Sequence, residues 1–385
     1  MPLIDDLAGG DKQAALGKIA DLLAKNGIDV DEIGRINRIS VYQSLTKNNE
    51  GEAEVHDLFG VQLSPSWESG PEWDLVTQAP PVNVTIRSIK PEPKPDGYKT
   101  AMIVPDIQIG YYRDADESLV PTHDETAISL CLEVTRRLDP ELVVLVGDNI
   151  DLPELGKYRL SPAFVRTTQA SIDRTAQFAA ELRAAAPNAE IIWLAGNHEE
   201  RLTNYVLDNA KAAFGLRRGD TPDGWPVLSV PHLARFDEYG IRYLAGYPAS
   251  SWWINDRLQV RHGDRVRSNG STAHAYLNTQ KHSVIYGHIH RREWAERSRE
   301  TFDGPSTILA ASPGTLARCD GAVPSTKGGI DVDGRPLTVV EDWQQGFAVV
   351  TYHPDGPFWY EQIPIHHGQA WWRGKLVGYG ITEGQ

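Results

Sequence analysis

The chain has 385 residues, of which 41% are hydrophobic and 23% are charged, and its formal net charge is −14 at pH 7. This composition is too apolar for a disordered chain, and a length of this order accommodates one large domain or two. The negative charge excludes a protein that coats nucleic acid by bulk attraction, although it is compatible with a local basic cleft.

Cysteine usage and the N-terminus predict a cytoplasmic protein. The two cysteines, Cys131 and Cys319, show no C-x-x-C spacing, which favours a reducing compartment over a disulfide framework. The first residues, Met-Pro-Leu-Ile-Asp-Asp, lack the basic and apolar regions of a secretory signal. No window approaches the roughly 18 apolar residues of a membrane span, so we expect no membrane association.

The first part of the chain predicts a small α+β domain. Apolar residues at helical spacing between positions 16 and 23 predict a helix that ends at Asn26-Gly27. Three strands are expected to follow, at residues 39–45, 55–63 and 82–86. Residues 90–97 then carry proline at three alternate positions, a pattern typical of a stiff, extended linker. We therefore predict an accessory domain over residues 1–89, a linker over 90–97 and a second domain over 98–385.

The second domain begins with alternating strands and helices. Strands are expected at residues 101–104, 142–146 and 191–194, and helices at 122–138 and 167–186. This order predicts an α/β fold with a parallel sheet. Six further short strands are expected to form a second, more antiparallel sheet packed on the first, at residues 241–244, 258–261, 284–286, 307–309, 347–352 and 358–362.

Potential metal ligands follow the predicted strands in five short blocks. They are Pro-Asp-Ile-Gln (Asp106, Gln108), Gly-Asp-Asn-Ile-Asp (Asp148, Asp151), Gly-Asn-His-Glu (Asn197, His198), Arg-His-Gly-Asp (His262) and Gly-His-Ile-His (His288, His290). Aspartate, asparagine and histidine form a mixed oxygen and nitrogen donor set that suits Mn, Fe or Zn. One such block alone would indicate an ordinary turn. Five in sequence, each at the carboxyl end of a strand, indicate a two-metal phosphoesterase.

The five blocks resemble the signature of the calcineurin-like metallophosphoesterases. That signature reads D-x-H, G-D-x-x-D, G-N-H-[DE], a lone histidine and G-H-x-H, and it is matched in order across Asp106 to His290. With the flanking strands, the resemblance covers about residues 98–365 and points to the phage and bacterial type. It implies a layered α/β/β/α sandwich, a hydroxide held by two divalent metal ions as the nucleophile, and manganese as the metal, with Mg, Fe or Zn as alternatives.

The resemblance also assigns roles to individual residues. The first metal would be held by Asp106, Gln108 and His290, the second by Asn197, His262 and His288, with Asp148 bridging the two. His198 corresponds to a histidine that is not a ligand and assists departure of the leaving group. Asp151 corresponds to the acid that orients this histidine and keeps it cationic by raising its pKa.

Two departures from the family pattern narrow the expectation. Gln108 stands where the family has histidine, and its amide oxygen is a weaker donor, so we expect a looser first site that favours Mn or Mg. The alternatives are a half-empty site or a non-catalytic scaffold such as the retromer type. Leu152 stands where serine/threonine protein phosphatases of this superfamily have a phosphate-binding arginine. A phosphodiesterase or nuclease is therefore favoured over a protein phosphatase.

The nature of the substrate depends on weaker patterns. Arginines crowd the later blocks and predict phosphate contacts, although a solvated charged loop explains them equally well: Arg261, Arg265, Arg267, Arg291 and Arg292. We predict hydrolysis of phosphodiester bonds in nucleotides or nucleic acid, with a phosphomonoesterase or nucleotidase as the alternative. The N-terminal domain could recognise nucleic acid, mediate self-association or brace the catalytic domain.

Overall fold

The computed structural model describes residues 21 and 23–25, residues 33–47 and 53–65, and residues 96–378 except 158–159, 221–222, 303, 326–327, 332–334 and 339. The chain divides into two units, Met1–Ala79 and Pro80–Gln385. Of the predicted linker, only Asp96 and Gly97 lie among the described residues. The linker and the domain limits drawn from it therefore stay predictions.

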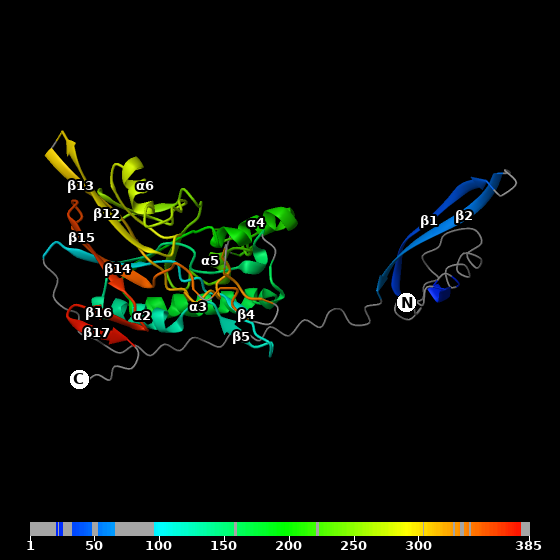
Figure 1. Cartoon of the computed structure of the whole chain (residues 1–385), viewed down its shortest axis with the longest axis horizontal. Helices are drawn as coiled ribbons and strands as arrows, with labels where there is room; N and C mark the ends of the chain where they lie inside the picture. The colour runs from blue at the N-terminus through cyan, green and yellow to red at the C-terminus, as the bar shows by residue number, and fades with distance from the viewer. Residues whose placement is uncertain are drawn as a thin grey trace. The chain divides into compact units, whose positions relative to one another are not determined.

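The first unit contains an antiparallel pair of long strands, β1 (Ile33–Lys47) and β2 (Ala53–Pro65), shown in Figure 1. Both strands include the predicted ranges and extend beyond them at each end. Backbone hydrogen bonds between the two strands do not depend on the side chains, so the pairing continues past the apolar residues. Residues 21 and 23–25 are helical. The third strand, expected at 82–86, lies outside the described residues.

A six-stranded sheet forms the centre of the second unit, in the order β15-β14-β3-β6-β7-β8. Strands β3, β6, β7 and β8 run parallel, β14 is antiparallel to β3, and β15 is antiparallel to β14. All four residues of β6 are buried, as expected of a strand that is covered on both faces. The bounds are β3 (Lys99–Val104), β6 (Leu142–Leu145), β7 (Glu190–Leu194), β8 (Ile241–Leu244), β14 (Gly346–Tyr352) and β15 (Phe358–Pro364).

A five-stranded sheet follows the order β12-β13-β11-β10-β9. Strands β10, β11 and β13 are parallel, while β9 and β12 are antiparallel edge strands. The carboxyl ends of β10 and β11 therefore lie side by side. The bounds are β9 (Ser251–Trp253), β10 (Leu258–Arg261), β11 (Ser283–Tyr286), β12 (Arg292–Thr301) and β13 (Gly304–Pro313).

The distribution of strands between the two sheets corrects the sequence prediction. Strands β8, β14 and β15 were expected in the second sheet, but all three belong to the first. The second sheet is also not mainly antiparallel, because its three central strands are parallel. A short apolar run predicts a strand, but it does not predict which distant strand becomes its partner.

Helices α2 (Glu125–Leu138) and α3 (Thr168–Ala185) are capped in different ways. The Asp124 side chain caps α2 by accepting hydrogen bonds from the backbone N–H groups of Thr126 and Ala127 in its first turn. The residue before α3 makes no side-chain cap. Instead, the Glu154 carboxylate accepts hydrogen bonds from the backbone N–H groups of Arg166, Thr167 and Thr168 at 2.8–2.9 Å. The segment after Asp151 thus anchors α3 to the site.

Buried side chains join each face of the six-stranded sheet to a different neighbour. On one face the cluster includes α2 and α3, which lie together in Figure 1, with Met102, Val143, Ile191 and Phe178. On the other face the cluster joins the two sheets and includes Ile103, Val144, Val260 and Ile285. A further cluster joins helix α6 (Thr272–Thr279) to β11 and β13 through Tyr276, Val284 and Ile308.

The remaining elements are short. They are helices α4 (Glu199–Asn209) and α5 (Val230–Leu233), strands β4 (Tyr111–Arg113), β5 (Leu119–Pro121), β16 (Gln369–Trp372) and β17 (Lys375–Gly378), and the 3-10 turns η2 (Pro153–Leu155), η3 (Pro162–Phe164) and η4 (Lys211–Ala213). Among the described helices, none has both the length and the apolar character needed to cross a membrane.

Candidate metal centre

The predicted ligands lie at the carboxyl ends of parallel strands from both sheets. In the six-stranded sheet, β3 is followed by Asp106 and Gln108, β6 by Asp148, and β7 by Asn197 and His198. In the five-stranded sheet, β10 is followed by His262, and β11 by His288 and His290. Because the two sheets share a core, segments far apart in the sequence meet at one edge.

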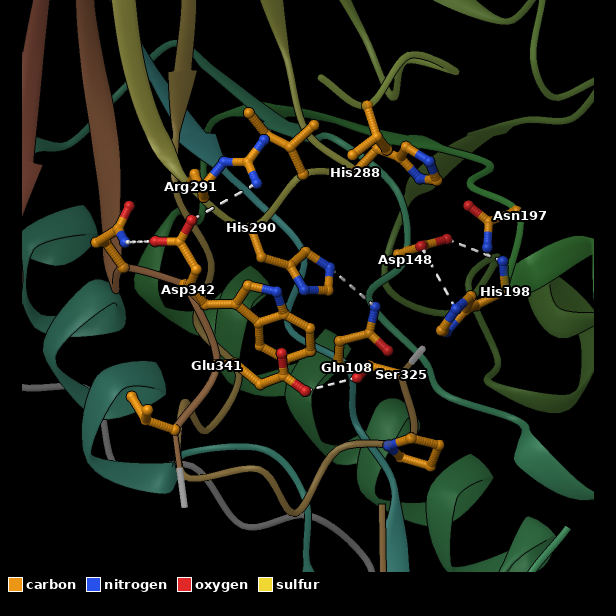
Figure 2. Close-up of a pocket in the computed structure, with 16 residues that line it drawn as sticks. Gln108, Asp148, Asn197, His198, His288, His290, Arg291, Ser325, Glu341 and Asp342 are labelled. Carbon is orange, nitrogen blue, oxygen red and sulfur yellow. Dashed lines mark hydrogen bonds and ion pairs between the residues drawn. The ribbon is translucent and has the colours of Figure 1, made fainter. Parts of the chain in front are cut away.

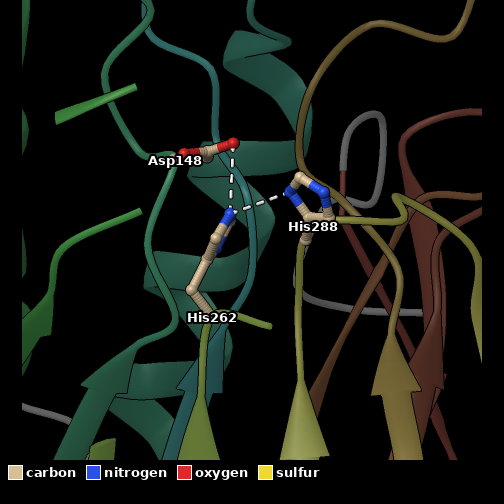
Figure 3. A group of neighbouring side chains, drawn as sticks. All are labelled: Asp148, His262 and His288. Carbon is tan, nitrogen blue, oxygen red and sulfur yellow. Dashed lines mark hydrogen bonds and ion pairs between the residues drawn. The ribbon is translucent and has the colours of Figure 1, made fainter. Parts of the chain in front are cut away.

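Three of these side chains converge on the Nε2 atom of His262. Asp148 Oδ2, Asn197 Oδ1 and His288 Nδ1 each lie 3.2 Å from it, and Figure 3 shows the two histidines and the aspartate. The other ring nitrogen, Nδ1, lies 3.0 Å from the carbonyl oxygen of Val146. That carbonyl can only accept, so Nδ1 carries a proton there, and Nε2 is the ring nitrogen that a metal would bind after displacing the proton on it.

The pKa values of these groups follow from burial and from their mutual charges. Burial raises the pKa of Asp148, but the rings of His198 and His262 outweigh it and hold the pKa well below its ordinary value. Burial lowers the pKa of His262, and Asp148 raises it to about 9. Burial and the neighbouring His262 lower the pKa of His288 to about 4. Near neutral pH, Asp148 is therefore charged and His288 is neutral, the forms in which carboxylate and imidazole bind metals.

A second group of donors shares Asp148 with the first. Donor atoms of Asp106, Asp148 and His290 lie within 4.8 Å of one another, as do those of Asp148, His262 and His288. Gln108 reaches the group through its amide nitrogen, which lies 3.3 Å from His290 Nε2. Its amide oxygen is buried and has no hydrogen-bond partner.

This donor set fits a pair of divalent ions. Two ions that share a bridging ligand require a carboxylate that belongs to both donor groups, and Asp148 does. The buried amide oxygen of Gln108 has no hydrogen-bond partner, which costs free energy unless a ligand such as a metal ion satisfies it. His290 Nε2 cannot both accept the Gln108 N–H and bind a metal. For Gln108 and His290 to bind one ion together, the Gln108 amide would have to turn its oxygen inward, a rotation that exchanges two atoms of similar size.

Four of the predicted ligands have a left-handed backbone. The φ angle is 56° at Gln108, 51° at Asp148, 71° at His288 and 56° at His290. Residues other than glycine seldom adopt this region, and such strain concentrates at functional sites. The strained backbone of the loops after β3, β6 and β11 thus orients the side chains of the predicted ligands, and it lowers the stability of these loops.

Glu199 ties two of the ligand loops together, a role that the sequence analysis did not predict. Its buried carboxylate accepts hydrogen bonds from the backbone N–H groups of Asp148, Asn149 and Gly196 at 2.8–2.9 Å, and from Trp193 Nε1 at 3.1 Å. The Gly-Asn-His-Glu block did contain the signal, because a glutamate next to predicted site residues is expected to be buried with them, and a buried carboxylate needs hydrogen-bond partners.

Glycine precedes the ligands because the carboxylates approach its Cα closely. A Cβ atom at Gly287 would lie 2.4 Å from Asp106 Oδ2, and one at Gly196 would lie 2.2 Å from Asp148 Oδ1. Side chains of metal ligands cannot retreat without losing their geometry. The two glycines are therefore part of the ligand arrangement.

We expect Gly287→Ala to displace Asp106 and weaken metal binding at the first site by about 10- to 100-fold. Metal titration followed by calorimetry measures the loss. Gly219→Ala is the matched control, since a Cβ atom there meets nothing within 4 Å and the residue lacks a positive φ. Unchanged affinity in Gly287→Ala would contradict the role given to this glycine.

His198 lies beside the metal donors and is held by two further side chains. Its backbone N–H donates to Asp148 Oδ1 at 2.8 Å. Its ring nitrogen Nδ1 lies 3.1 Å from Asp151 Oδ1, and Nε2 lies 2.8 Å from the Arg201 guanidinium. The structure thus places His198 between Asp151 and Arg201, of which the sequence analysis named only Asp151. Arg201 follows His198 by three residues, a spacing that places two side chains on the same face of a helix, so the sequence could have indicated this contact.

A cavity of about 1000 Å³ opens beside His198 and Asp148. Figure 2 shows the side chains that line it. Its far wall comes from a segment that the sequence analysis did not assign to the site: Pro324, Ser325, Val340, Glu341, Asp342, Trp343 and Gln344. The Trp343 ring packs edge-on against the His290 ring, with 4.2 Å between the centroids. The Glu341 carboxylate accepts a hydrogen bond from Ser325 at 2.6 Å.

Of the predicted substrate arginines, Arg291 is the one that lines this cavity. Its guanidinium lies 3.4 Å from Glu293 and 3.8 Å from Asp342. Arg265 stacks over Tyr276 and bonds to residues of α6, and Arg261 donates to the carbonyl of Pro248. Arg292 is likewise absent from the lining. For these three residues, substrate binding stays a prediction without a contact that supports it.

Comparison with known proteins gives one distant relative. No family model matches the chain. Over 267 residues, which make up 64% of this chain and 72% of the relative, the sequence is 24% identical to a cAMP/cGMP dual specificity phosphodiesterase of Mycobacterium tuberculosis. The chain is thus similar, at low identity, to a protein named as a phosphodiesterase.

Proposed function

We propose that the chain is a metal-dependent phosphodiesterase of the calcineurin-like type that hydrolyses nucleotide diesters with two divalent ions. The observation that carries the proposal is the position of Asp148, which belongs to two groups of metal donors and lines the same cavity as His288 and His290. The similarity to a cyclic-nucleotide phosphodiesterase supports it. The shared core of the two sheets, with helices packed on their outer faces, supports the layered α/β/β/α arrangement.

The residues of the site fit in-line displacement at phosphorus. Bound divalent ions would lower the pKa of a water molecule and neutralise the phosphoryl oxygens. Asp106, Gln108 and His290 would hold one ion, and Asn197, His262 and His288 the other, with Asp148 between them. His198 lines the cavity next to Asp148, where it assists departure of the alcohol while Asp151 orients its ring.

The cavity favours a small nucleotide over nucleic acid. Apart from histidines, Arg291 is the one basic side chain among the described residues of its lining, and two carboxylates lie near it. The far wall adds Glu341. Binding to a nucleic-acid backbone depends on several cationic contacts to flanking phosphates, which this wall does not supply. A substrate with a single diester, such as a cyclic nucleotide, matches the charges better.

One assay distinguishes the candidate functions. The protein, reconstituted with Mn, is offered a bis-aryl phosphate, a mono-aryl phosphate, cAMP, cGMP and labelled single- and double-stranded DNA. We expect turnover of the bis-aryl phosphate and of a cyclic nucleotide. Preference for the mono-aryl phosphate would identify a phosphomonoesterase, cleavage of DNA would identify a nuclease, and inactivity on every substrate would favour a scaffold.

Gln108 is expected to set the metal preference. Gln108→His removes the amide N–H that competes for His290 Nε2 and introduces a stronger donor. We expect the affinity of the first site for Mn and Zn to rise by about tenfold or more, a magnitude typical of changes around a metal. Stoichiometry by elemental analysis and affinity by titration measure it. If both stay at the wild-type level, Gln108 does not limit the first site.

A further inference from the structure

Arg201, His198 and Asp151 form a triangle of contacts, of which the two made by Arg201 are hydrogen bonds and the third is an ion-pair contact. The arginine lies on α4, one turn after His198, which immediately precedes the helix. Its Nη1 atom lies 2.5 Å from Asp151 Oδ1, and its Nη2 atom lies 2.8 Å from His198 Nε2. The third side is the 3.1 Å distance from His198 Nδ1 to the same Asp151 oxygen. All three side chains are largely buried, with exposed fractions of 19%, 10% and 1% for Arg201, His198 and Asp151.

The triangle determines how the His198 ring is held. A guanidinium only donates hydrogen bonds, so His198 Nε2 must accept, and the single ring proton then lies on Nδ1 facing Asp151. In this arrangement the ring is neutral, not cationic as the sequence analysis expected. The hydrogen bond from Arg201 also restrains the orientation of the His198 ring. It holds Nε2 close to the predicted metal donors, at 3.7 Å from Asp148 Oδ2. Asp151 alone would leave the ring free to turn about one contact.

We propose that Arg201 is a positioning residue that acts on the reaction through His198. The proposal rests on the proposed function, since it concerns the step that His198 assists. Arginine suits the role because its planar fork reaches two acceptors at once, whereas lysine presents a single point charge. Once Nε2 has turned from Arg201 to the substrate, it can take up a proton from solvent and pass that proton to the leaving oxygen. The guanidinium thus sets the resting position from which the ring acts.

A double-mutant cycle tests the proposal with aryl phosphodiesters of graded leaving-group pKa. We expect Arg201→Ala to lower kcat by about 10- to 100-fold with little change in KM, and most strongly for poor leaving groups. Because Arg201 acts through His198, the same substitution should have no further effect in His198→Ala. Arg201→Lys should recover part of the loss. Arg218→Ala, at an exposed ion pair, is the control and should match wild type.

Two outcomes of the cycle would overturn the proposal. Equal losses in the wild-type and His198→Ala backgrounds would mean that Arg201 contacts the substrate directly, as would a change confined to KM. Loss of bound metal in Arg201→Ala, measured by elemental analysis, would mean that the arginine maintains the centre itself.

A second readout needs no turnover, so it separates failure of this proposal from failure of the proposed function. Long-range ¹H–¹⁵N spectra of histidine-labelled, metal-free protein report which ring nitrogen of His198 carries the proton. We expect Nδ1 in wild type and a mixture of tautomers in Arg201→Ala. If the wild-type spectrum shows the proton on Nε2, or if the substitution changes nothing, Arg201 does not hold the ring.

Discussion

Asp148→Ala is expected to lower kcat/KM for a phosphodiester by at least about 1,000-fold, because several kcal/mol of charge stabilisation depend on the ions that this carboxylate would bridge. No other described residue belongs to both donor groups. Loss of Asp148 therefore affects both sites at once, whereas His288→Ala removes a ligand of one. Hydrolysis of a bis-aryl phosphate with added Mn measures the effect.

The matched control is Asp173→Ala, which removes an exposed carboxylate from α3. It should keep wild-type activity. Bound metal, measured in parallel, should fall in Asp148→Ala and stay constant in the control. If Asp148→Ala retained more than a tenth of the wild-type rate, a centre built around a shared carboxylate would be untenable.

Glu199→Ala is expected to lower the free energy of unfolding by at least about 3 kcal/mol, because each buried donor left without a partner costs about 1–3 kcal/mol. The carboxylate satisfies three backbone N–H groups and the indole N–H of Trp193. The loops that carry Asp148 and Asn197 would separate, so metal binding should fall as well. Urea denaturation monitored by tryptophan fluorescence measures the stability.

Glu200→Ala provides the comparison, since the next residue is only partly buried and accepts one long hydrogen bond, at 3.4 Å. Its effect on stability should be within about 0.5 kcal/mol of zero. Glu199→Gln should lie between the two alanine variants, because the amide keeps one acceptor oxygen. Equal urea midpoints for Glu199→Ala and Glu200→Ala would contradict the anchoring role.

The sequence predicted the local elements better than their assembly. The strand before Asp148 and helices α2 and α3 were predicted within a few residues, because buried runs and caps are local signals. The order of the strands in the two sheets was not, since pairing depends on contacts across the chain. Edge strand β12 was missed because most of its side chains are exposed or half-buried and lack an apolar pattern.

The candidate site shows the same division. The predicted ligands meet because order along the chain and position after a strand are both readable from sequence. The supporting contacts of Glu199 and Arg201 depend on how buried groups find partners, which requires coordinates. The far wall, with Trp343 and Glu341, comes from a segment without a recognisable motif. The arginines were predicted to bind substrate because they lie near the motifs in the sequence. In the structure, Arg261 and Arg265 donate hydrogen bonds to the backbone carbonyls of Pro248 and Ala275 instead.

The left-handed backbone of four predicted ligands has a consequence for how the sequence of this fold can change. Each non-glycine residue in that conformation costs on the order of 1–2 kcal/mol, so selection retains Gln108, Asp148, His288 and His290 only while their side chains are used. A descendant that no longer binds metal is released from this constraint and drifts toward glycine or asparagine at these positions. In an alignment, glycine or asparagine at these four positions would identify relatives that no longer bind metal. Relatives that keep the original residues would be those that still use the metal site.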